Sequence, residues 1–197
     1  VRAIGYEAQI LDAEAERIDY IETAKRISEY DARIICFVVY GNNVNAGTAS
    51  MSGAVQLANF LKKENVKPKI SFIGSHVQAL PIDTLKKEKS IDFVFTNEGV
   101  YSLHNLLKLE KFGSEQLKAI KGIGYKYKGN VKLTPPEKIV PQEKMDIDLP
   151  GYAWDLLPFK KKPFDLYRAP MWHAEYVEEN RTPYAALQTS LGCQFQC

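Results

Sequence analysis

Two cysteines close to the end of the printed sequence have a spacing suited to metal chemistry. Cys193 and Cys197 lie four positions apart, directly after Gly192 and a short apolar stretch. Iron–sulfur clusters are held by thiolates that a tight turn brings within reach of one another. A zinc knuckle or a redox dithiol more often uses Cys-x-x-Cys, and the sequence supplies no second pair. The spacing therefore favours the opening of an iron–sulfur ligand loop. Its third thiolate would lie beyond residue 197, so we expect a fragment of a longer protein.

The composition is that of a soluble globular protein and excludes several other classes. Hydrophobic residues make up 45% and charged residues 25% of the 197 residues, and the net charge of +2 provides no electrostatic case for nucleic-acid binding. No apolar run approaches the ~18 residues of a membrane span, and no signal peptide opens the chain. Cys36 lies in an apolar run and is expected to be a small buried core residue. Three cysteines do not form a disulfide framework, so we expect a cytoplasmic location.

Strand and helix patterns alternate along the first half of the chain. Strands are expected at residues 4–11, 33–39, 69–73 and 91–95, and helices at 20–30, from Ser50 or Ser52 to Lys63, at 81–87 and at 98–109. The continuous apolar run at 33–39 is typical of a central strand covered on both faces. This alternation predicts an α/β fold with a doubly wound parallel sheet of the Rossmann or flavodoxin type.

The pattern changes after residue 110. Two short strands around Lys128-Gly129-Asn130 predict a hairpin within residues 122–133. Prolines and aromatic residues then alternate without helical periodicity, and a last strand is expected at 184–189. We therefore divide the chain into an α/β domain at 1–140, truncated at its N-terminus, an irregular linker at 141–183 and the start of a further domain at 184–197.

Polar and small residues follow three of the expected strands. They are Tyr40-Gly41, Gly74-Ser75-His76 and Asn97-Glu98. Each group also has an ordinary explanation: a surface loop for the first, a helix-capping or surface histidine for the second, and an N-cap with an acid in the first turn for the third. Ligands of open parallel sheets bind beyond the carboxyl ends of the strands, so the three groups together predict a site at that edge. No Gly-x-Gly-x-x-Gly, phosphate-binding loop or Gly-x-Ser-x-Gly elbow is present.

Taken together, these motifs resemble a known family. The stretch from Leu191 to Cys197 resembles the start of the radical S-adenosylmethionine signature, Cys-x-x-x-Cys-x-aromatic-Cys, and residues 186–190 resemble the first strand of its TIM-type barrel. Residues 70–79 resemble the Gly-Gly-x-His segment of the cobalamin-binding domain found in many such enzymes. Residues 91–99 resemble that domain's Asp-aromatic-Val-x-x-Gly-Glu-Gly-Glu segment.

The sequence departs from the family pattern at three places within the cobalamin-binding segments. Ser75 replaces the second glycine, Asn97 replaces a glycine and Val100 replaces an acid. The loop that supplies a lower histidine ligand in other cobalamin carriers would fall before residue 1.

The resemblance implies three cofactors: cobalamin, a 4Fe-4S cluster and S-adenosylmethionine. It implies that cobalamin is lined by Tyr40, Gly41, Gly74, Ser75, His76, Asn97 and Glu98. Cys193 and Cys197 would ligate iron, and no residue of this chain is assigned a catalytic role. The implied activity is radical methyl transfer to an unactivated carbon of a small metabolite or natural-product precursor, with electrons from a donor such as flavodoxin or ferredoxin.

Two alternatives remain open from the sequence. One is a sister enzyme whose cobalamin serves a rearrangement or ring closure. The other is a non-catalytic cobalamin-binding or sensor module. A cysteine three positions after Cys197 would favour the enzymes.

Overall fold

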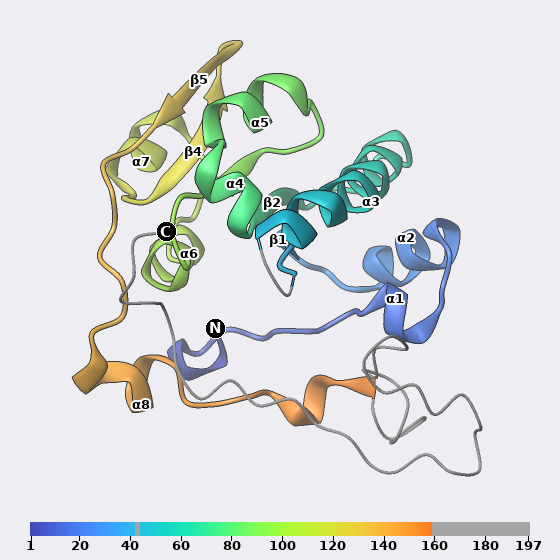
Figure 1. The fold of residues 1–197 in the computed structure, drawn as a ribbon, viewed down its shortest axis with the longest axis horizontal. Coiled ribbons are helices and arrows are strands. Elements are labelled where there is room, and N and C mark those ends of the chain that lie inside the picture. Colours follow the sequence, from blue (N-terminus) through green and yellow to red (C-terminus); the bar gives the residue numbers. More distant parts are fainter. Residues whose placement is uncertain (42–43, 159–197) are drawn as a thin grey trace. The chain divides into compact units, whose positions relative to one another are not determined.

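The structure is a computed structural model that describes residues 1–41 and 44–158. Its centre is a five-stranded sheet in the order β1-β2-β3-β4-β5 (Figure 1). The strands are β1 Ile34–Val38, β2 Lys69–Ile73, β3 Phe93–Phe95, β4 Ile123–Tyr127 and β5 Asn130–Leu133. β1, β2 and β3 pair in parallel, whereas β3–β4 and β4–β5 pair antiparallel.

The sheet is thus mixed: the predicted parallel arrangement holds for β1, β2 and β3, and the hairpin strands join the same sheet with antiparallel pairing. The α/β class and the parallel core are confirmed, as is the hairpin, which is formed by β4 and β5. Lys128 and Gly129 have φ values of 47° and 78° at its tip. Positive φ at both central residues is what a two-residue hairpin turn of type I′ requires. Such a turn forces antiparallel pairing, because a parallel neighbour needs a long crossover connection.

The described helices are α1 Ala13–Glu16, α2 Tyr20–Glu29, α3 Val44–Lys63, α4 Ser75–Ala79, α5 Pro81–Lys87, α6 Val100–Leu107, α7 Ser114–Ala119 and α8 Met145–Asp148. Helices pack on both faces of the sheet: α4 and α5 contact its strands, and α6 and α7 contribute to the core cluster with β3. Short 3-10 turns lie at Arg2–Ile4, Gln142–Lys144 and Trp154–Leu156. None of the helices in the described ranges has the length and hydropathy of a bilayer-spanning segment.

Alternate residues of the strands face different helices. On one face, Phe93 and Phe95 of β3 pack with Leu106 of α6 and Leu117 of α7 in one buried cluster. On the other face α4 and α5 contact the sheet, and a side chain at Gly124 would meet Val94 and Leu85. This alternation explains the continuous apolar runs of the sequence, because both faces of these strands are covered.

The chain divides into two compact units. The first comprises residues 1–8 and 19–152 and contains the sheet, and the second comprises residues 9–18 and those from 153 onward. The division at residue 140 and the linker at 141–183 stay predictions, and the expected strand at 184–189 lies outside the described residues.

One expected strand is absent, and the expected start of one long helix is wrong. The expected strand at 91–95 and helix at 98–109 are present but shorter, as β3 and α6. Residues 5–11 form no strand, although Ile4, Tyr6, Ala8 and Ile10 alternate as in a strand. α3 begins at Val44 and not at Ser50 or Ser52. The Ser50 hydroxyl donates to Ala46 O at 3.0 Å, a bond made within a helix that has already started.

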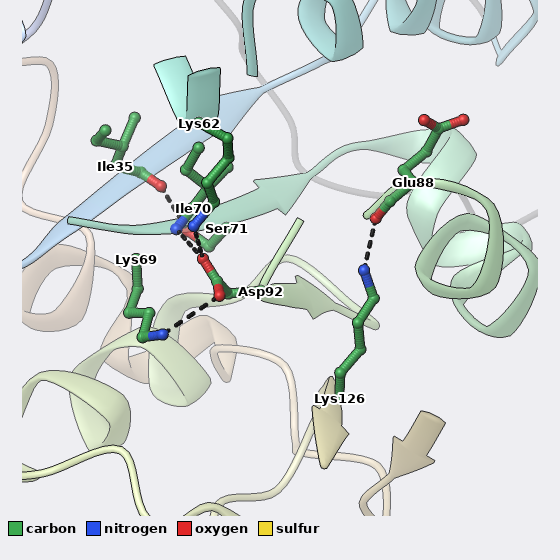
Figure 2. A network of polar contacts seen from close by, with 8 residues as sticks. All are labelled: Ile35, Lys62, Lys69, Ile70, Ser71, Glu88, Asp92 and Lys126. Atoms are coloured by element: carbon green, nitrogen blue, oxygen red, sulfur yellow. Dashed lines mark hydrogen bonds and ion pairs between the residues drawn. The ribbon is translucent and has the colours of Figure 1, made fainter. Parts of the chain in front are cut away.

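A polar network holds the amino-terminal edge of the sheet together (Figure 2). The carboxylate of Asp92 accepts hydrogen bonds from Lys62 Nζ at 2.7 Å, Lys69 Nζ at 3.4 Å and Ile70 N at 2.9 Å. Lys126 Nζ donates to Glu88 O at 2.6 Å. Because Asp92 directly precedes β3, it ties the end of α3 and the start of β2 to that strand. This fixes the relative positions of the strands whose other ends form the candidate site.

Candidate functional site

The loops after β1 and β2 approach each other without intervening side chains. Val39 N donates to Ile73 O at 2.8 Å, which extends the parallel pairing past the end of β1. Gly74 has φ 148°, and a Cβ at this position would lie 1.9 Å from Val39 O. A Cβ on Gly47 would lie 2.3 Å from Ser75 Oγ, and one on Gly41 would lie 2.5 Å from Ala46 Cβ. Backbone and small side chains therefore form this part of the edge.

A single amide joins the ends of all three parallel strands. Gln78, in α4 directly after β2, donates from Nε2 to Tyr40 Oη at 3.0 Å and to Asn97 O at 2.8 Å. Tyr40 follows β1 and Asn97 follows β3, so Gln78 brings together one residue from the first and one from the third of the predicted groups. Gln78 itself was not singled out in the sequence. The one feature of the sequence that could have indicated Gln78 is its position, about one helical turn after Gly74. That feature has meaning only if a helix begins there, and α4 was not predicted.

Asn97 and Glu98 hold the segment that follows the hairpin. We call residues 134–148 the strap (Figure 1). Asn97 Oδ1 accepts from Gly99 N at 2.9 Å, an Asx turn ahead of α6, while Asn97 Nδ2 donates to Glu137 O at 2.9 Å. The Glu98 carboxylate accepts from the buried amide of Val140. The side chains of Asn97 and Glu98 therefore hydrogen-bond to the strap, and they also lie at the carboxyl edge of the sheet.

His76 faces away from this cluster, toward α3. Its Nδ1 lies 3.2 Å from Thr48 Oγ1. With Met51 and Gln56 of α3 and Thr84 of α5, His76 lines a cavity of about 380 Å³ between the helices. The structure thus brings Tyr40 and Asn97 together through Gln78 and places His76 on the flank.

Ser75 carries a hydroxyl whose hydrogen-bonding capacity is unmet. Its Oγ is buried beside Gly47 and has no partner in the part of the chain that the structure describes. A buried hydroxyl without a partner costs roughly 1–3 kcal/mol. Such groups in native proteins often mark positions that a ligand or a bound water satisfies.

The phenol of Tyr40 is kept protonated. Partial burial raises its pKa, the hydrogen bond from Gln78 opposes that change, and the nearby Glu98 carboxylate raises the pKa further. The residue is nevertheless 49% exposed. Tyr40 therefore presents an aromatic ring and a neutral hydroxyl at the carboxyl edge of the sheet.

The described residues contain no cluster of three or more His, Cys, Asp and Glu side chains that could hold a metal ion. Cys193 and Cys197 lie outside the described residues, so their predicted role as iron ligands stays a prediction. Cys36 of β1, expected to be buried, is only partly buried, but it packs against the core cluster, and desolvation raises the pKa of its thiol. A thiol with a raised pKa is a poor nucleophile and a poor metal ligand.

Comparison with known proteins identifies one informative relative. The chain matches no protein-family model. It is 30% identical over 192 residues, 98% of its length, to an uncharacterized methyltransferase of Pyrococcus horikoshii. The matched region is 36% of that protein, so the chain spans about a third of the relative's length.

Proposed function

We propose that this chain is the cofactor-binding part of a methyltransferase, and that the carboxyl edge of β1, β2 and β3 binds cobalamin. The observation that carries the proposal is the Gln78 amide, which joins Tyr40 and Asn97 across the strand ends. Methyl transfer is supported by the relative named above and is preferred to a rearrangement or a sensor role for that reason.

The residues at the edge suit the chemical character of cobalamin. A corrin ring carries primary amides around its rim, so its site needs hydrogen-bonding groups and room for a broad ligand to approach. Tyr40 offers a hydroxyl and an exposed ring. The Ser75 hydroxyl has no partner among the described residues, but it is buried beside Gly47. Gly41, Gly47 and Gly74 let the loops that carry these groups pack closely against one another, because a Cβ at any of them would meet neighbouring protein atoms. Bound cobalamin would supply a methyl group for transfer, while these residues orient the cofactor and exclude water.

The second half of the proposal is radical S-adenosylmethionine chemistry. It rests on the resemblance of the segment around Cys193 and Cys197 to the signature of those enzymes. The two thiolates would be ligands of a 4Fe-4S cluster that binds S-adenosylmethionine, and an electron donor such as flavodoxin or ferredoxin would reduce it. The substrate would be a small molecule bound mainly by the rest of the enzyme.

Cobalamin binding tests the proposal directly. The 197-residue chain is titrated with hydroxocobalamin or methylcobalamin, and binding is followed by equilibrium dialysis and the visible absorbance of the corrin. We expect one cobalamin per chain. Tyr40→Ala should weaken binding about tenfold or more, from lost ring contact and a lost hydrogen bond. Tyr127→Ala, on the exposed hairpin, is the matched control and should bind normally. A wild-type chain that retains no cobalamin contradicts the proposal.

A further inference from the structure

We infer that Gln78 is a positioning residue that turns the hydroxyl of Tyr40 into a hydrogen-bond donor aimed at a neutral carbonyl of the ligand bound at this edge. The inference rests on the proposed function and deepens it. It assigns a role to a residue outside the predicted set and names the kind of group that the site recognises.

The first step is the orientation of the Gln78 amide. Asn97 O is a backbone carbonyl and can only accept a hydrogen bond, so the atom of Gln78 that lies 2.8 Å from it must be the nitrogen. The same nitrogen lies 3.0 Å from Tyr40 Oη. An amide nitrogen has two hydrogens, and these two bonds use both of them. The position of β3 therefore determines which atom of Gln78 faces Tyr40.

The second step concerns the hydrogen of Tyr40. Since the nitrogen of Gln78 can only donate, Tyr40 Oη is the acceptor in their contact. The phenolic hydrogen remains available, and no described residue accepts it. The residue is 49% exposed, so Tyr40 is not closed off from a ligand at this edge. The Gln78 amide thus fixes the direction of the hydrogen bonds that the Tyr40 hydroxyl makes. The hydroxyl accepts a hydrogen bond from Gln78 and donates its own hydrogen to the bound ligand.

The third step is the charge of the ligand group. Glu98 directly follows Asn97, whose carbonyl accepts from the same Gln78 nitrogen that contacts Tyr40. The Glu98 carboxylate is also one of the groups that raise the pKa of the Tyr40 phenol, after partial burial as the main cause. The same negative field opposes a phosphate or carboxylate at this position. A neutral carbonyl accepts from a phenol without that repulsion. The carboxamide side chains of a corrin present such carbonyls, which makes them the expected partner of Tyr40.

A double-mutant cycle separates positioning from simple structural support. The variants are Gln78→Met, which keeps the length of the side chain and removes both hydrogen bonds, Tyr40→Phe, and the double variant. We expect each single variant to weaken cobalamin binding about five- to tenfold, the loss of one hydrogen bond. The double variant should bind no more weakly than either single variant, because Gln78 acts through the Tyr40 hydroxyl. Gln116→Met, an exposed glutamine of α7, is the matched control and should bind as the wild type does.

A second readout does not depend on the cofactor. Absorbance is titrated to alkaline pH for the wild type, both single variants and the double variant. The curve of Tyr40→Phe is subtracted from that of the wild type, and the curve of the double variant from that of Gln78→Met. Each difference isolates the ionisation of Tyr40. Because the hydrogen bond from Gln78 lowers the pKa of Tyr40, Gln78→Met should shift this ionisation to higher pH. If the Gln78 nitrogen did not donate to the Tyr40 hydroxyl, the ionisation would stay in place.

Each outcome decides one of the two proposals. If the wild-type chain binds no cobalamin, the proposed function fails and the inference falls with it. If the wild type binds but Gln78→Met binds equally well, or the losses in the cycle are additive, only the inference is overturned. An unchanged ionisation of Tyr40 in Gln78→Met also overturns the inference, whatever the binding result.

Discussion

The carbonyl oxygen of Val39 lies where a side chain at Gly74 would begin. The distance from that oxygen to an ideal Cβ on Gly74 would be 1.9 Å, well inside van der Waals contact. The loops that follow β1 and β2 are therefore in direct backbone contact, and Tyr40 and Ser75 extend from this contact. The close packing of the two backbones, together with the hydrogen bond from Gln78 to Tyr40, places the candidate site residues of one loop beside those of the other.

Replacement of Gly74 by alanine should destabilise the fold strongly. The new Cβ meets a backbone atom and the residue keeps a φ of 148°, so we expect a loss of about 3 kcal/mol or more. Urea unfolding followed by circular dichroism measures the change. Gly53→Ala is the control: Gly53 lies in α3 with nothing within 4 Å of its added Cβ. That variant should gain about 0.5–1 kcal/mol. Equal stability of the two variants would contradict the close approach.

Removal of the Glu98 carboxylate should release the strap. Glu98→Ala leaves the buried amide of Val140 without its partner, which should cost about 1–3 kcal/mol. Hydrogen exchange at Val140 should become faster, as read by NMR or mass spectrometry. Glu143→Ala, an exposed position of the strap, should change stability by less than about 0.5 kcal/mol. Unaltered exchange at Val140 in Glu98→Ala would show that the contact does not hold the strap.

Asp92→Ala should destabilise the sheet by about 2 kcal/mol or more, because it removes two ion pairs and the acceptor of Ile70 N. Asp92→Asn can keep the last of these contacts and should lose less. Glu22→Gln interrupts the ion pair with Arg26 on the surface of α2 and should cost only about 0.5 kcal/mol. Added salt should reduce the difference between Asp92→Asn and the wild type. Similar costs for Asp92→Ala and Glu22→Gln would argue against a structural role for the network.

Tyr101 should make the stability of the fold sensitive to alkaline pH. The hydrogen bond that its hydroxyl donates to Asp148 raises the pKa of Tyr101 from 10.0 to about 12. A group whose pKa is raised in the folded state contributes stability that is fully present below the unfolded value. That contribution is lost as the pH rises from about 10 to about 12. Unfolding midpoints measured across this range should fall for the wild type and fall less for Tyr101→Phe. Asp148→Asn should move the ionisation of Tyr101 to lower pH, and parallel midpoint curves for all three proteins would refute the coupling.

Cys193 should be required for iron binding. After anaerobic reconstitution of the complete enzyme with iron and sulfide, we expect brown absorbance from a 4Fe-4S cluster, which Cys193→Ala should abolish. Cys36→Ala is the matched control, because Cys36 lies in β1 and its thiol has a raised pKa. Unchanged iron content in Cys193→Ala would remove this residue from the ligand set.

Parts of the fold were predictable because local signals determine them. Residues 69–73 and 81–87 were expected as a strand and a helix with the bounds that β2 and α5 have. Pro68 and Gly74 delimit the strand, and Pro81 begins the helix, so local backbone chemistry marks these ends. The start of α3 was missed because its first turns are small and polar, a composition that also suits a loop.

Other features depend on partners distant in sequence. The alternation in residues 4–11 is that of a strand, but a strand also needs a neighbour, and none pairs with it among the described residues. β4 runs antiparallel to β3 because of the path that the chain takes through α6 and α7. The spacing of apolar residues in the sequence does not encode that path. At the site, Tyr40, Gly74 and Asn97 were identified because they follow strands. Gln78 was missed because its contacts depend on the spacing of β1 and β3.

The strands lie in the sheet in the same order as in the sequence, and this order affects how the protein folds. Every described strand of the sheet lies beside its predecessor in the sequence. During synthesis, each newly emerged strand can therefore add to an edge that already exists, without waiting for a later segment to insert between earlier ones. The hairpin completes the layer last, and the strap can close over the edge only after that, because Glu137 and Val140 both follow it.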